Sequence, residues 1–264
     1  KHLTKAKTLG IRVECFNAQE LKAFEPDEKI NAIGVVHYHC DASINPGEYL
    51  NVLRNWLIEN DVKMLQNEKV NGFEILDGKI KSVHCENRSY LADEIIISAG
   101  VQSMPLFKKL KLNIPVQPGK GYSFDNTKEL ALKHPAILVD GRVAVSLLNG
   151  FTRISGTMEI GGNDKKVKAK KVEGLVEAVN AYFPNYAQYY PAKEAVWVGH
   201  RPCSADGLPY IGRVEKYSNV LVATGHSMMG VSLAAITGKL MNELVSSGSS
   251  FVDFKPFKPY RFMR

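Results

Sequence analysis

The sequence has 264 residues, of which 45% are hydrophobic and 23% are charged, which is the balance of an ordinary globular protein with one large or two interleaved domains. Lysine and arginine outnumber aspartate and glutamate by 34 to 27, which gives a net charge of +7. No apolar run approaches the roughly 18–20 residues of a membrane-spanning helix, and no nucleic-acid-binding module accompanies the basic charge, so neither function is predicted.

Three helices are predicted in the first sixty residues. Apolar residues recur at helical spacing from the start of the chain, again after Asn17, and most clearly over Pro46–Asn60. Asn45 is suited to the cap of that last helix and Pro46 to its first turn. One face of this helix is expected to carry Tyr49, Leu50, Leu53, Trp56 and Leu57.

Strands are predicted next. Val62–Gln66 is expected to be a short strand, and the alternating runs Val70–Leu76 and Ile80–Glu86 flank Asp77-Gly78, which is typical of a hairpin turn. Glu94–Gly100 (EIIISAG) is continuously apolar and ends in small residues. Continuous apolarity indicates a strand covered on both faces, as in a mainly parallel sheet.

The pattern of apolar and turn residues changes in the second half of the chain. Short strands with turn signals between them occupy Ile114–Trp197 and predict an antiparallel sheet with one helix, Val172–Tyr182. Asn219–Gly225 then predicts a buried strand that leads through a glycine turn into a long helix, Met229–Ser247. The fold class is therefore α/β (α+β), with an antiparallel sheet inserted between two α/β segments.

Common site motifs are absent from the sequence. It contains no GxGxxG, HExxH or GxSxG, and Gly225–Gly230 has the spacing of a P-loop but is followed by Val231 where the P-loop lysine belongs. These observations argue against an NTPase and give no support to a hydrolase. The cysteines are far apart and form no CxxC, which predicts reduced cytoplasmic thiols and no metal site; they are Cys15, Cys40, Cys85 and Cys203.

Two segments remain as candidates for a functional site. In WVGHRPCSADGLPYIG, Pro202 holds Arg201 in extended backbone, so the guanidinium is suited either to a bound carboxylate or to a structural salt bridge. In TGHSMMG (Thr224–Gly230), a glycine turn leads from a strand into a helix. Such a turn presents backbone N–H groups to an anion, or it serves only as a tight connection.

In this order, the two segments resemble the C-terminal part of the FAD-dependent D-amino acid oxidase superfamily, and most of all the bacterial D-amino acid dehydrogenases. The family pattern W-x-G-x-R-P-x-[ST]-x-D-G-x-P-x-[IV]-G, followed by a strand and TGH-x-x-x-G, is met at every fixed position. Three further segments are similar to family motifs and occur in the family's order: Glu94–Ser103, Pro115–Phe124 and Phe151–Gly162.

The resemblance implies an incomplete FAD-binding doubly wound domain with an inserted antiparallel-sheet substrate domain. Residues 1–44 would be a substrate-domain segment and connection, 45–100 part of the FAD-binding domain, 101–196 the antiparallel substrate domain, and 197–264 the C-terminal part of the FAD-binding domain. Family members begin with a βαβ unit that carries GxGxxG. The chain is therefore expected to be a fragment that lacks this N-terminal ADP-binding segment.

The activity that the resemblance implies is the oxidation of a D-amino acid to an imine by hydride transfer to FAD, followed by hydrolysis to a 2-oxo acid and ammonia. Arg201 would bind the substrate carboxylate, and Tyr122 would line the substrate pocket or belong to the core. His226 would face the flavin or cap its turn, and Asp206 would form a turn. The residues expected to contact FAD are Val70, Ala99, Gly100, Gly225, His226, Ser227, Met228, Met229, Gly230 and Val231.

Partners and alternatives follow from the same resemblance. The bacterial dehydrogenases pass electrons to the respiratory chain, so a cytoplasmic protein peripheral to the inner face of the membrane is expected, with a basic face as its docking surface. The alternatives are an oxidase of glycine, sarcosine or a proline derivative, or a non-catalytic remnant that acts as a binding module. The tail Phe254–Phe262, with its repeated prolines, is expected to be an extended strap over the surface.

Overall fold

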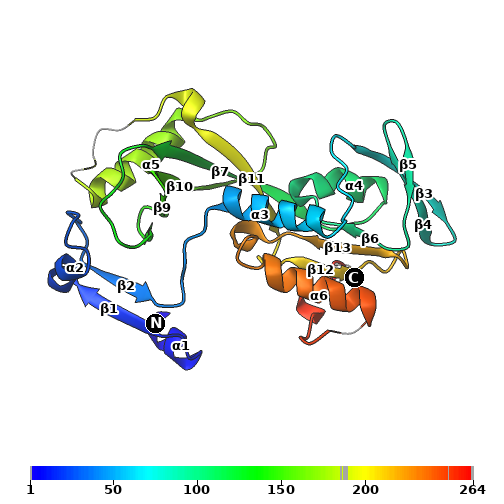
Figure 1. The fold of residues 1–264 in the computed structure, drawn as a ribbon, viewed down its shortest axis with the longest axis horizontal. Helices are drawn as coiled ribbons and strands as arrows, with labels where there is room; N and C mark the ends of the chain where they lie inside the picture. Colours follow the sequence, from blue (N-terminus) through cyan, green and yellow to red (C-terminus); the bar gives the residue numbers. More distant parts are fainter. Residues whose placement is uncertain (1, 185, 187–189, 249, 263–264) are drawn as a thin grey trace. The chain divides into compact units, whose positions relative to one another are not determined.

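A computed structural model describes residues 2–184, 186, 190–248 and 250–262 (Figure 1). The chain forms two compact units, each assembled from several stretches of sequence. The first unit comprises Lys1–Asn51, Gly121–Met158 and Asp164–Gly199; the second comprises Val52–Lys120, Glu159–Asn163 and His200–Arg264. The units are defined by contacts and not by function. The division into substrate-domain and FAD-binding segments, made from the sequence at residues 44, 100 and 196, therefore remains a prediction.

The first unit begins with an N-terminal arm, residues 2–38. The arm consists of α1 (His2–Thr8), β1 (Val13–Asn17), α2 (Ala18–Phe24) and β2 (Gly34–Tyr38), with β1 and β2 paired antiparallel. The Oδ1 atom of Asn17 accepts hydrogen bonds from the N–H groups of Gln19 and Glu20, and Glu20 accepts one from the N–H of Asn17. This reciprocal capping box satisfies the first free donors of α2 and explains why the helix begins after Asn17.

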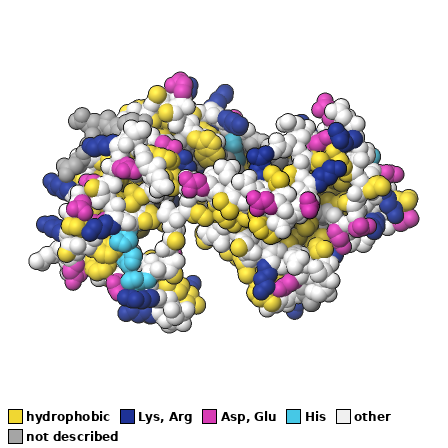
Figure 2. Space-filling model, viewed as in Figure 1, with side chains coloured by type: hydrophobic (Ala, Val, Ile, Leu, Met, Phe, Trp, Pro, Cys, Tyr) yellow, Lys and Arg dark blue, Asp and Glu magenta, His cyan; other side chains and the backbone are white. Residues whose placement is uncertain are grey.

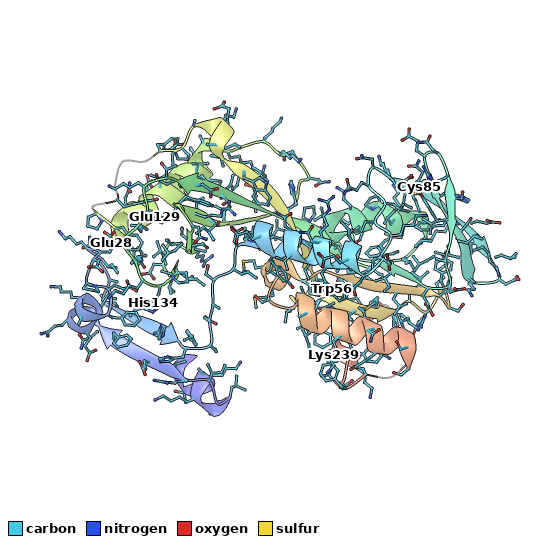
Figure 3. All side chains as sticks on the ribbon, viewed as in Figure 1. Glu28, Trp56, Cys85, Glu129, His134 and Lys239 are labelled. Atoms are coloured by element: carbon cyan, nitrogen blue, oxygen red, sulfur yellow. The ribbon has the colours of Figure 1, made fainter. Side chains whose placement is uncertain are left out.

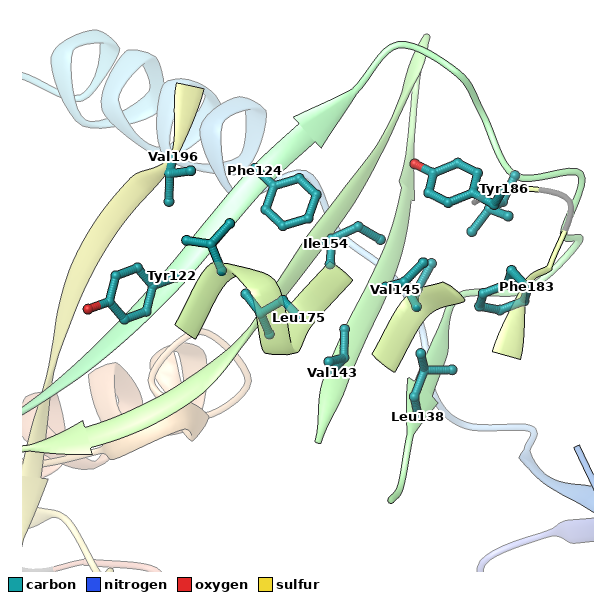
Figure 4. Close-up of a cluster of buried hydrophobic side chains, with 13 residues drawn as sticks. Tyr122, Phe124, Leu138, Val143, Val145, Ile154, Leu175, Phe183, Tyr186 and Val196 are labelled. Carbon is teal, nitrogen blue, oxygen red and sulfur yellow. The ribbon is translucent and has the colours of Figure 1, made fainter. Parts of the chain in front are cut away.

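The predicted antiparallel sheet is confirmed. It has the order β11-β7-β10-β9-β8, formed by β11 (Trp197–Ser204), β7 (Val116–Asn126), β10 (Phe151–Ile160), β9 (Val143–Leu148) and β8 (Ala136–Leu138). The predicted helix is α5 (Ala169–Tyr182), and it begins three residues earlier than Val172. Figure 4 shows side chains of α5 and of the strands interlocked in one buried cluster, which is the core of the first unit.

The second unit holds two small sheets. The sheet β3-β4-β5 is antiparallel, and its hairpin turns at Asp77 and Gly78, whose φ angles of 50° and 68° suit the predicted Asp-Gly turn. In the other sheet, of order β12-β13-β6, β13 pairs antiparallel with β12 and parallel with β6. The strands are β3 (Val70–Leu76), β4 (Lys79–Cys85), β5 (Ser89–Leu91), β6 (Ile95–Ile97), β12 (Tyr210–Arg213) and β13 (Val220–Thr224).

Three helices lie in or enter the second unit, and short 3-10 turns separate several elements. The helices are α3 (Pro46–Glu59), which crosses the boundary between the units, α4 (Ser103–Lys109) and α6 (Ala234–Ser246). The 3-10 turns in this part of the chain are η1 (Gly100–Gln102), η3 (Ser227–Met229) and η4 (Lys255–Phe257), and η2 (Lys193–Ala195) lies in the first unit. None of the described helices combines the length and apolarity that crossing a bilayer requires.

One buried side chain ties the two small sheets of the second unit together. The amide of Asn219, just before β13, accepts a hydrogen bond from the N–H of Ile80 on β4 and donates one to the carbonyl of the same residue, both at 2.9 Å. The carbonyl of Asn219 accepts a hydrogen bond from the N–H of Ile95 at the start of β6. A buried amide with its hydrogen bonds satisfied fixes the relative position of the strands that it joins.

Two strand predictions need correction. Val62–Gln66 is extended but is not a strand, because no described segment pairs with it and its side chains are exposed. β6 is parallel to β13 as predicted, yet it is not covered on both faces, since Ile96 is 45% exposed. Alternation of apolar residues reports what a segment is able to bury, whereas pairing and burial depend on neighbours.

Two predictions near the C-terminus also differ from the structure. The helix after β13 begins at Ala234 and not at Met229, because Met229 ends η3 and residues 230–233 form turns in which the N–H groups of Gly230, Val231 and Ser232 make no helical hydrogen bond. The tail does cover the second unit, where Phe254 and Phe257 pack against a buried cluster. It is not extended, however, because η4 folds it into a turn of 3-10 helix.

The predicted apolar face of α3 is present in the sequence but unburied in the structure. No residue of α3 is buried, and Trp56 is 57% exposed (labelled in Figure 3). Asn45 does cap the helix as predicted, since its Oδ1 accepts the N–H of Gly47 at 3.1 Å. Exposed large side chains along one helix mark a surface that is able to pack against a further apolar surface.

Candidate active site

The ends of two parallel strands bring together two of the predicted cofactor segments. Ala99 and Gly100 follow β6, while Gly225 and the residues after it follow the neighbouring strand β13. The hydroxyl of Thr224 donates to the carbonyl of Gly100 over 3.3 Å, so the two turns are in direct contact. Ligands of open α/β sheets bind at the carboxyl ends of parallel strands, which is where this pair of turns lies.

The turn after β13 is shaped by Gly225. Its φ angle of +81° is one that side-chain-bearing residues rarely adopt, and a Cβ atom at this position would lie 2.8 Å from Cδ2 of Tyr210. Both constraints require glycine at this position, because only glycine allows the backbone to turn here and to pass this close to the Tyr210 ring.

Beyond Gly225 the turn presents backbone donors beside apolar side chains. Within the described part of the chain, the N–H groups of Gly230, Val231 and Ser232 donate no hydrogen bond to backbone or side chain. Met228 is 68% exposed, and Met229 and Val231 are also exposed. Free N–H groups flanked by exposed apolar side chains form a surface that fits a planar ligand with a polar edge.

His226 is tied to α6. Its Nε2 lies 3.0 Å from Oγ1 of Thr237, and the desolvation that comes with burial lowers the pKa of the imidazole. A neutral ring in hydrogen-bond contact with a helix agrees with the reading in which His226 stabilises its own turn. A contact between His226 and the flavin remains a prediction.

Arg201 on β11 carries a buried cation without an anion. Its Nη1 atom is inaccessible to solvent and has no hydrogen-bond partner among the described residues, none of which forms an ion pair with it. Burial lowers the pKa of the guanidinium, although an arginine stays protonated at any ordinary pH. The alternative of a structural salt bridge therefore finds no support among the described residues, and the binding of a substrate carboxylate by Arg201 stays a prediction.

A β-bridge joins the Arg201 strand to the glycine turn. Cys203, two residues after Arg201, forms an antiparallel bridge with His226, and its Sγ lies 3.6 Å from Oγ of Ser227. Because side chains alternate along a strand, Arg201 and Cys203 share one face of β11. The candidate carboxylate site and the candidate flavin turn are thus neighbours within the second unit.

Polar side chains that the sequence did not single out are also buried without partners. Within the described residues, Nε2 of His200 and Oγ of Ser204 find no hydrogen-bond partner, and neither does Oγ of Ser103, whose side chain is wholly buried just after Gly100. Such groups are uncommon in folded proteins and mark places where a ligand or water is able to bind. In the sequence, only their closeness to Arg201 and Gly100 could have indicated that these residues belong to the candidate site, and this indication is weak.

Two of the predicted site residues, Tyr122 and Val70, lie elsewhere. Tyr122 on β7 belongs to the first unit, where it is 1% exposed and packs beside Leu175, with its hydroxyl directed away from the cluster (Figure 4). Val70 begins β3, in the sheet that does not contain β6 or β13. A pocket role for Tyr122 and an adenine contact for Val70 stay predictions.

Asp206 behaves as a turn residue. Its Oδ1 accepts the N–H of Leu208 at 3.1 Å, and both carboxylate oxygens are held by Arg261 from the C-terminal tail. The Arg261 guanidinium lowers the pKa of Asp206 to about 2, so this carboxylate does not serve as a general acid. Among the described residues, no group of three His, Cys, Asp or Glu side chains is arranged to hold a metal ion.

The residues present fit one part of FAD. The exposed methionines and the free N–H groups of the turn after β13 suit the flavin ring, and the small residues Ala99 and Gly100 leave room beside it. No GxGxxG turn is present in the sequence to hold the pyrophosphate. The fit therefore extends to the flavin edge and not to the ADP half.

Known proteins similar to this chain identify its family. Residues 1–244 match the family model DAO, described as FAD dependent oxidoreductase. The chain is 28% identical over 260 residues to a D-amino-acid oxidase of Bradyrhizobium diazoefficiens, covering 97% of this chain and 62% of that protein. It is 27% identical over 237 residues to a D-amino acid dehydrogenase of Helicobacter pylori, covering 89% of this chain and 57% of that protein.

A solved structure shows the same fold. Glycine oxidase from Geobacillus kaustophilus superimposes with a TM-score of 0.88 at 22% identity, covering 98% of this chain and 70% of that one. The chain spans about 60% of the length of the two sequence relatives. It belongs to the DAO family of FAD-dependent oxidoreductases, whose cofactor is FAD.

Proposed function

We propose that this chain provides the substrate-carboxylate site and the flavin-edge site of an enzyme that oxidises D-amino acids to 2-oxo acids and ammonia. The relatives that are a D-amino-acid oxidase and a D-amino acid dehydrogenase support this substrate class. The observation that carries the proposal is the buried Nη1 of Arg201, which has no partner among the described residues and lies on the strand that bridges to the glycine turn.

In this proposal Arg201 orients the substrate. A guanidinium binds a carboxylate through two parallel hydrogen bonds, which fixes the direction of the bond from the carboxyl carbon to Cα. Holding Cα in one position accelerates such a reaction, because the entropy cost of orienting the reacting atoms is already met on binding. Burial of the guanidinium also excludes water from the pair and strengthens it.

Bound FAD supplies the acceptor for the two electrons and the proton that leave Cα as hydride. The substrate Cα–N bond becomes a C=N bond, and water then replaces the nitrogen to give the 2-oxo acid and ammonia. The chain contributes the N–H groups of Gly230, Val231 and Ser232, which are available to a polar edge that gains negative charge. A neutral substrate amine needs no side-chain base, which agrees with the lack of an acid–base pair beside Arg201.

We further propose that a GxGxxG unit outside this sequence completes FAD binding. The exposed apolar side chains of α3 and the exposed Ile96 on β6 offer a surface against which such a unit would pack. The half-site at the ends of β6 and β13 would then hold the flavin while the added unit holds the pyrophosphate.

The test begins with the visible absorption spectrum of the purified chain after incubation with FAD and removal of the excess. A retained flavin spectrum that bleaches when D-alanine is added without oxygen supports both the site and the substrate class. Bleaching by glycine, sarcosine or proline, with none by D-amino acids, supports the alternative substrate classes. If no flavin is retained, the same measurement is made after adding a GxGxxG-containing segment of a family member.

Absence of flavin even with the added segment would contradict the proposed cofactor site and favour a non-catalytic binding module. The exchange of Arg201 for alanine separates the two halves of the proposal. It should leave flavin retention intact and abolish bleaching by amino acids, because the guanidinium is assigned to the substrate and not to the cofactor.

For the electron acceptor, we propose a respiratory-chain component reached from the cytoplasmic face of the membrane. The net charge of +7 supports attraction to an anionic lipid surface. Cosedimentation with vesicles containing anionic lipids, lost as salt is raised, is the expected result. Equal binding to neutral vesicles, or none to either, would count against a peripheral membrane location.

A further inference from the structure

Three histidine rings of the first unit lie against one another where the N-terminal arm meets the rest of that unit. The ring centroid of His37, on β2, is 4.5 Å from that of His39 and 5.0 Å from that of His134. His134 lies between β7 and β8, and therefore outside the arm. Figure 2 shows histidine side chains gathered in one patch on the face in view, and Figure 3 labels His134 at this place.

An aromatic stack from the arm ends on His134. Phe24 of α2 stacks on the His134 ring with the centroids 4.6 Å apart and the planes 7° from parallel, and Phe16 of β1 stacks on Phe24 at 4.5 Å. His37 meets Phe24 edge to face at 5.2 Å. The arm thus docks through a small group of aromatic and imidazole rings rather than through aliphatic side chains.

Two of the three histidines have carboxylate partners. Nδ1 of His134 lies 2.6 Å from the buried carboxylate of Glu25, which also accepts the N–H of Lys133 at 2.7 Å. Nε2 of His39 lies 3.1 Å from the carboxylate of Glu14. A proton on either ring is therefore met by a negative charge at hydrogen-bond distance.

His37 has no such partner. Among the described residues, no carboxylate forms an ion pair with its ring, which stands between His39 and His134. Desolvation first, and then the charges of His39 and His134, lower the pKa of His37 below its ordinary 6.5; Arg12 acts in the same direction and Glu14 opposes it. A proton on His37 would therefore place a positive charge between the rings of His39 and His134, with no carboxylate to meet it.

We propose that the cluster of His37, His39 and His134 is a pH-sensitive contact, which holds the N-terminal arm on the first unit while His37 is neutral and loosens it when His37 is protonated. No group of three potential metal ligands in the described chain has the geometry to bind a metal ion, so the proton is the ligand that this cluster takes. The mechanism does not rest on the proposed flavin site, which lies in the other unit.

The direction of the effect follows from linkage. His37 binds a proton more weakly in the docked arm than in the free arm, so its contribution favours docking at high pH and is lost as the pH falls below 6.5. The pair of Glu25 and His134 crosses the same contact and is strengthened by a proton, so it keeps α2 docked. Contacts that do not involve His37 keep the base of the arm in place. The N–H of Asn31 donates to the carbonyl of Tyr182 at 2.8 Å, and Glu28 accepts the N–H of Ala131 at 3.1 Å. The expected change is therefore a local opening of β1 and β2 rather than unfolding.

Hydrogen–deuterium exchange of the full chain tests the proposal, with rates corrected for the intrinsic effect of pH. Between pH 7.5 and pH 5.5, the amides of Val13–Asn17 and Gly34–Tyr38 should lose protection several-fold, while those of Val143–Leu148 keep theirs. The variants His37→Gln and His37→Phe cannot take up the proton, so the protection of both strands should become independent of pH.

Two results would overturn the proposal. One is wild-type protection of β1 and β2 that does not change over this pH range, and the other is a loss of protection that persists in both His37 variants. The control is His84→Gln on β4, in the second unit, whose ring pairs with Ser89; this variant should behave as the wild type does. If one of the two His37 variants has lost the amide protection of β1 and β2 already at pH 7.5, its arm is undocked, and the pH dependence of the other variant is then used. A titration of His37 by NMR at its ordinary pKa in the docked arm would also count against the proposal.

Discussion

The hydroxyl of Thr224 donates a hydrogen bond to the carbonyl of Gly100 over 3.3 Å and so fastens together two turns that are more than a hundred residues apart in sequence. Thr224 ends β13, and Gly100 follows β6, its parallel neighbour. The proposed flavin-edge site therefore depends on the pairing of two strands rather than on either turn alone.

The first prediction concerns Arg201. In a flavin-loaded enzyme, Arg201→Ala should lower kcat/KM for D-alanine by about 100-fold or more, because a paired hydrogen bond to a charged group contributes roughly 3 kcal/mol. Arg201→Lys keeps the charge but loses the two-pronged geometry, so it should fall between alanine and wild type. Arg12→Ala, exposed before β1 in the first unit, is the matched control and should leave kcat/KM unchanged. Wild-type kinetics for Arg201→Ala would remove the assigned role.

A second prediction separates the conformational need for glycine at two positions. Gly225→Ala should lower the free energy of unfolding by about 1–3 kcal/mol, because φ is +81° and the new Cβ would meet the Tyr210 ring at 2.8 Å. Gly238→Ala, in the middle of α6 with open space around it, should instead raise that free energy by about 0.5–1 kcal/mol. Urea unfolding of the two variants measures both, and equal effects would contradict the steric argument.

A third prediction uses the pair of Asp206 and Arg261. The pKa of Asp206 is lowered from 3.8 to about 2, so the pair stabilises the fold above pH 4, and this contribution disappears as the pH falls towards 2. Solvent screens the partly exposed carboxylate, so Asp206→Asn should cost roughly 1 kcal/mol at pH 5 and nothing near pH 2. Urea unfolding at several pH values checks this. The exposed Asp93→Asn is the control, and a cost for Asp206→Asn that is the same at both pH values would refute the linkage.

The fourth prediction concerns the buried amide of Asn219. Asn219→Ala leaves the N–H and the carbonyl of Ile80 without their side-chain partners inside the core, which should cost about 2–4 kcal/mol of unfolding free energy. Thermal unfolding should show a correspondingly lower Tm. Asn87→Ala, in the exposed turn before β5, should be close to neutral. A small effect at Asn219 would show that the two sheets of the second unit are held together by other contacts.

Interactions between residues close together in sequence made several helix starts and turns predictable. Capping residues placed the starts of the helices after Asn17 and Asn45, and Asp77-Gly78 placed a hairpin, because each of these effects acts within four residues of its cause. The helix after β13 was placed too early because its apolar spacing continues back through residues 229–233, which form the end of η3 and turns instead of α-helix. Spacing reports which side chains a helix would bury and not where the backbone is able to begin one.

The sequence by itself also determined the family and the two candidate segments, since the fixed positions around Arg201 and Gly225 lie close together along the chain. Only the tertiary structure decided that Arg201 has no anionic partner among the described residues, that Cys203 bridges its strand to His226, and that His37 stands between two other histidines. These facts depend on distances between residues far apart in sequence. Such distances are set by strand pairing and core packing, which no local pattern encodes.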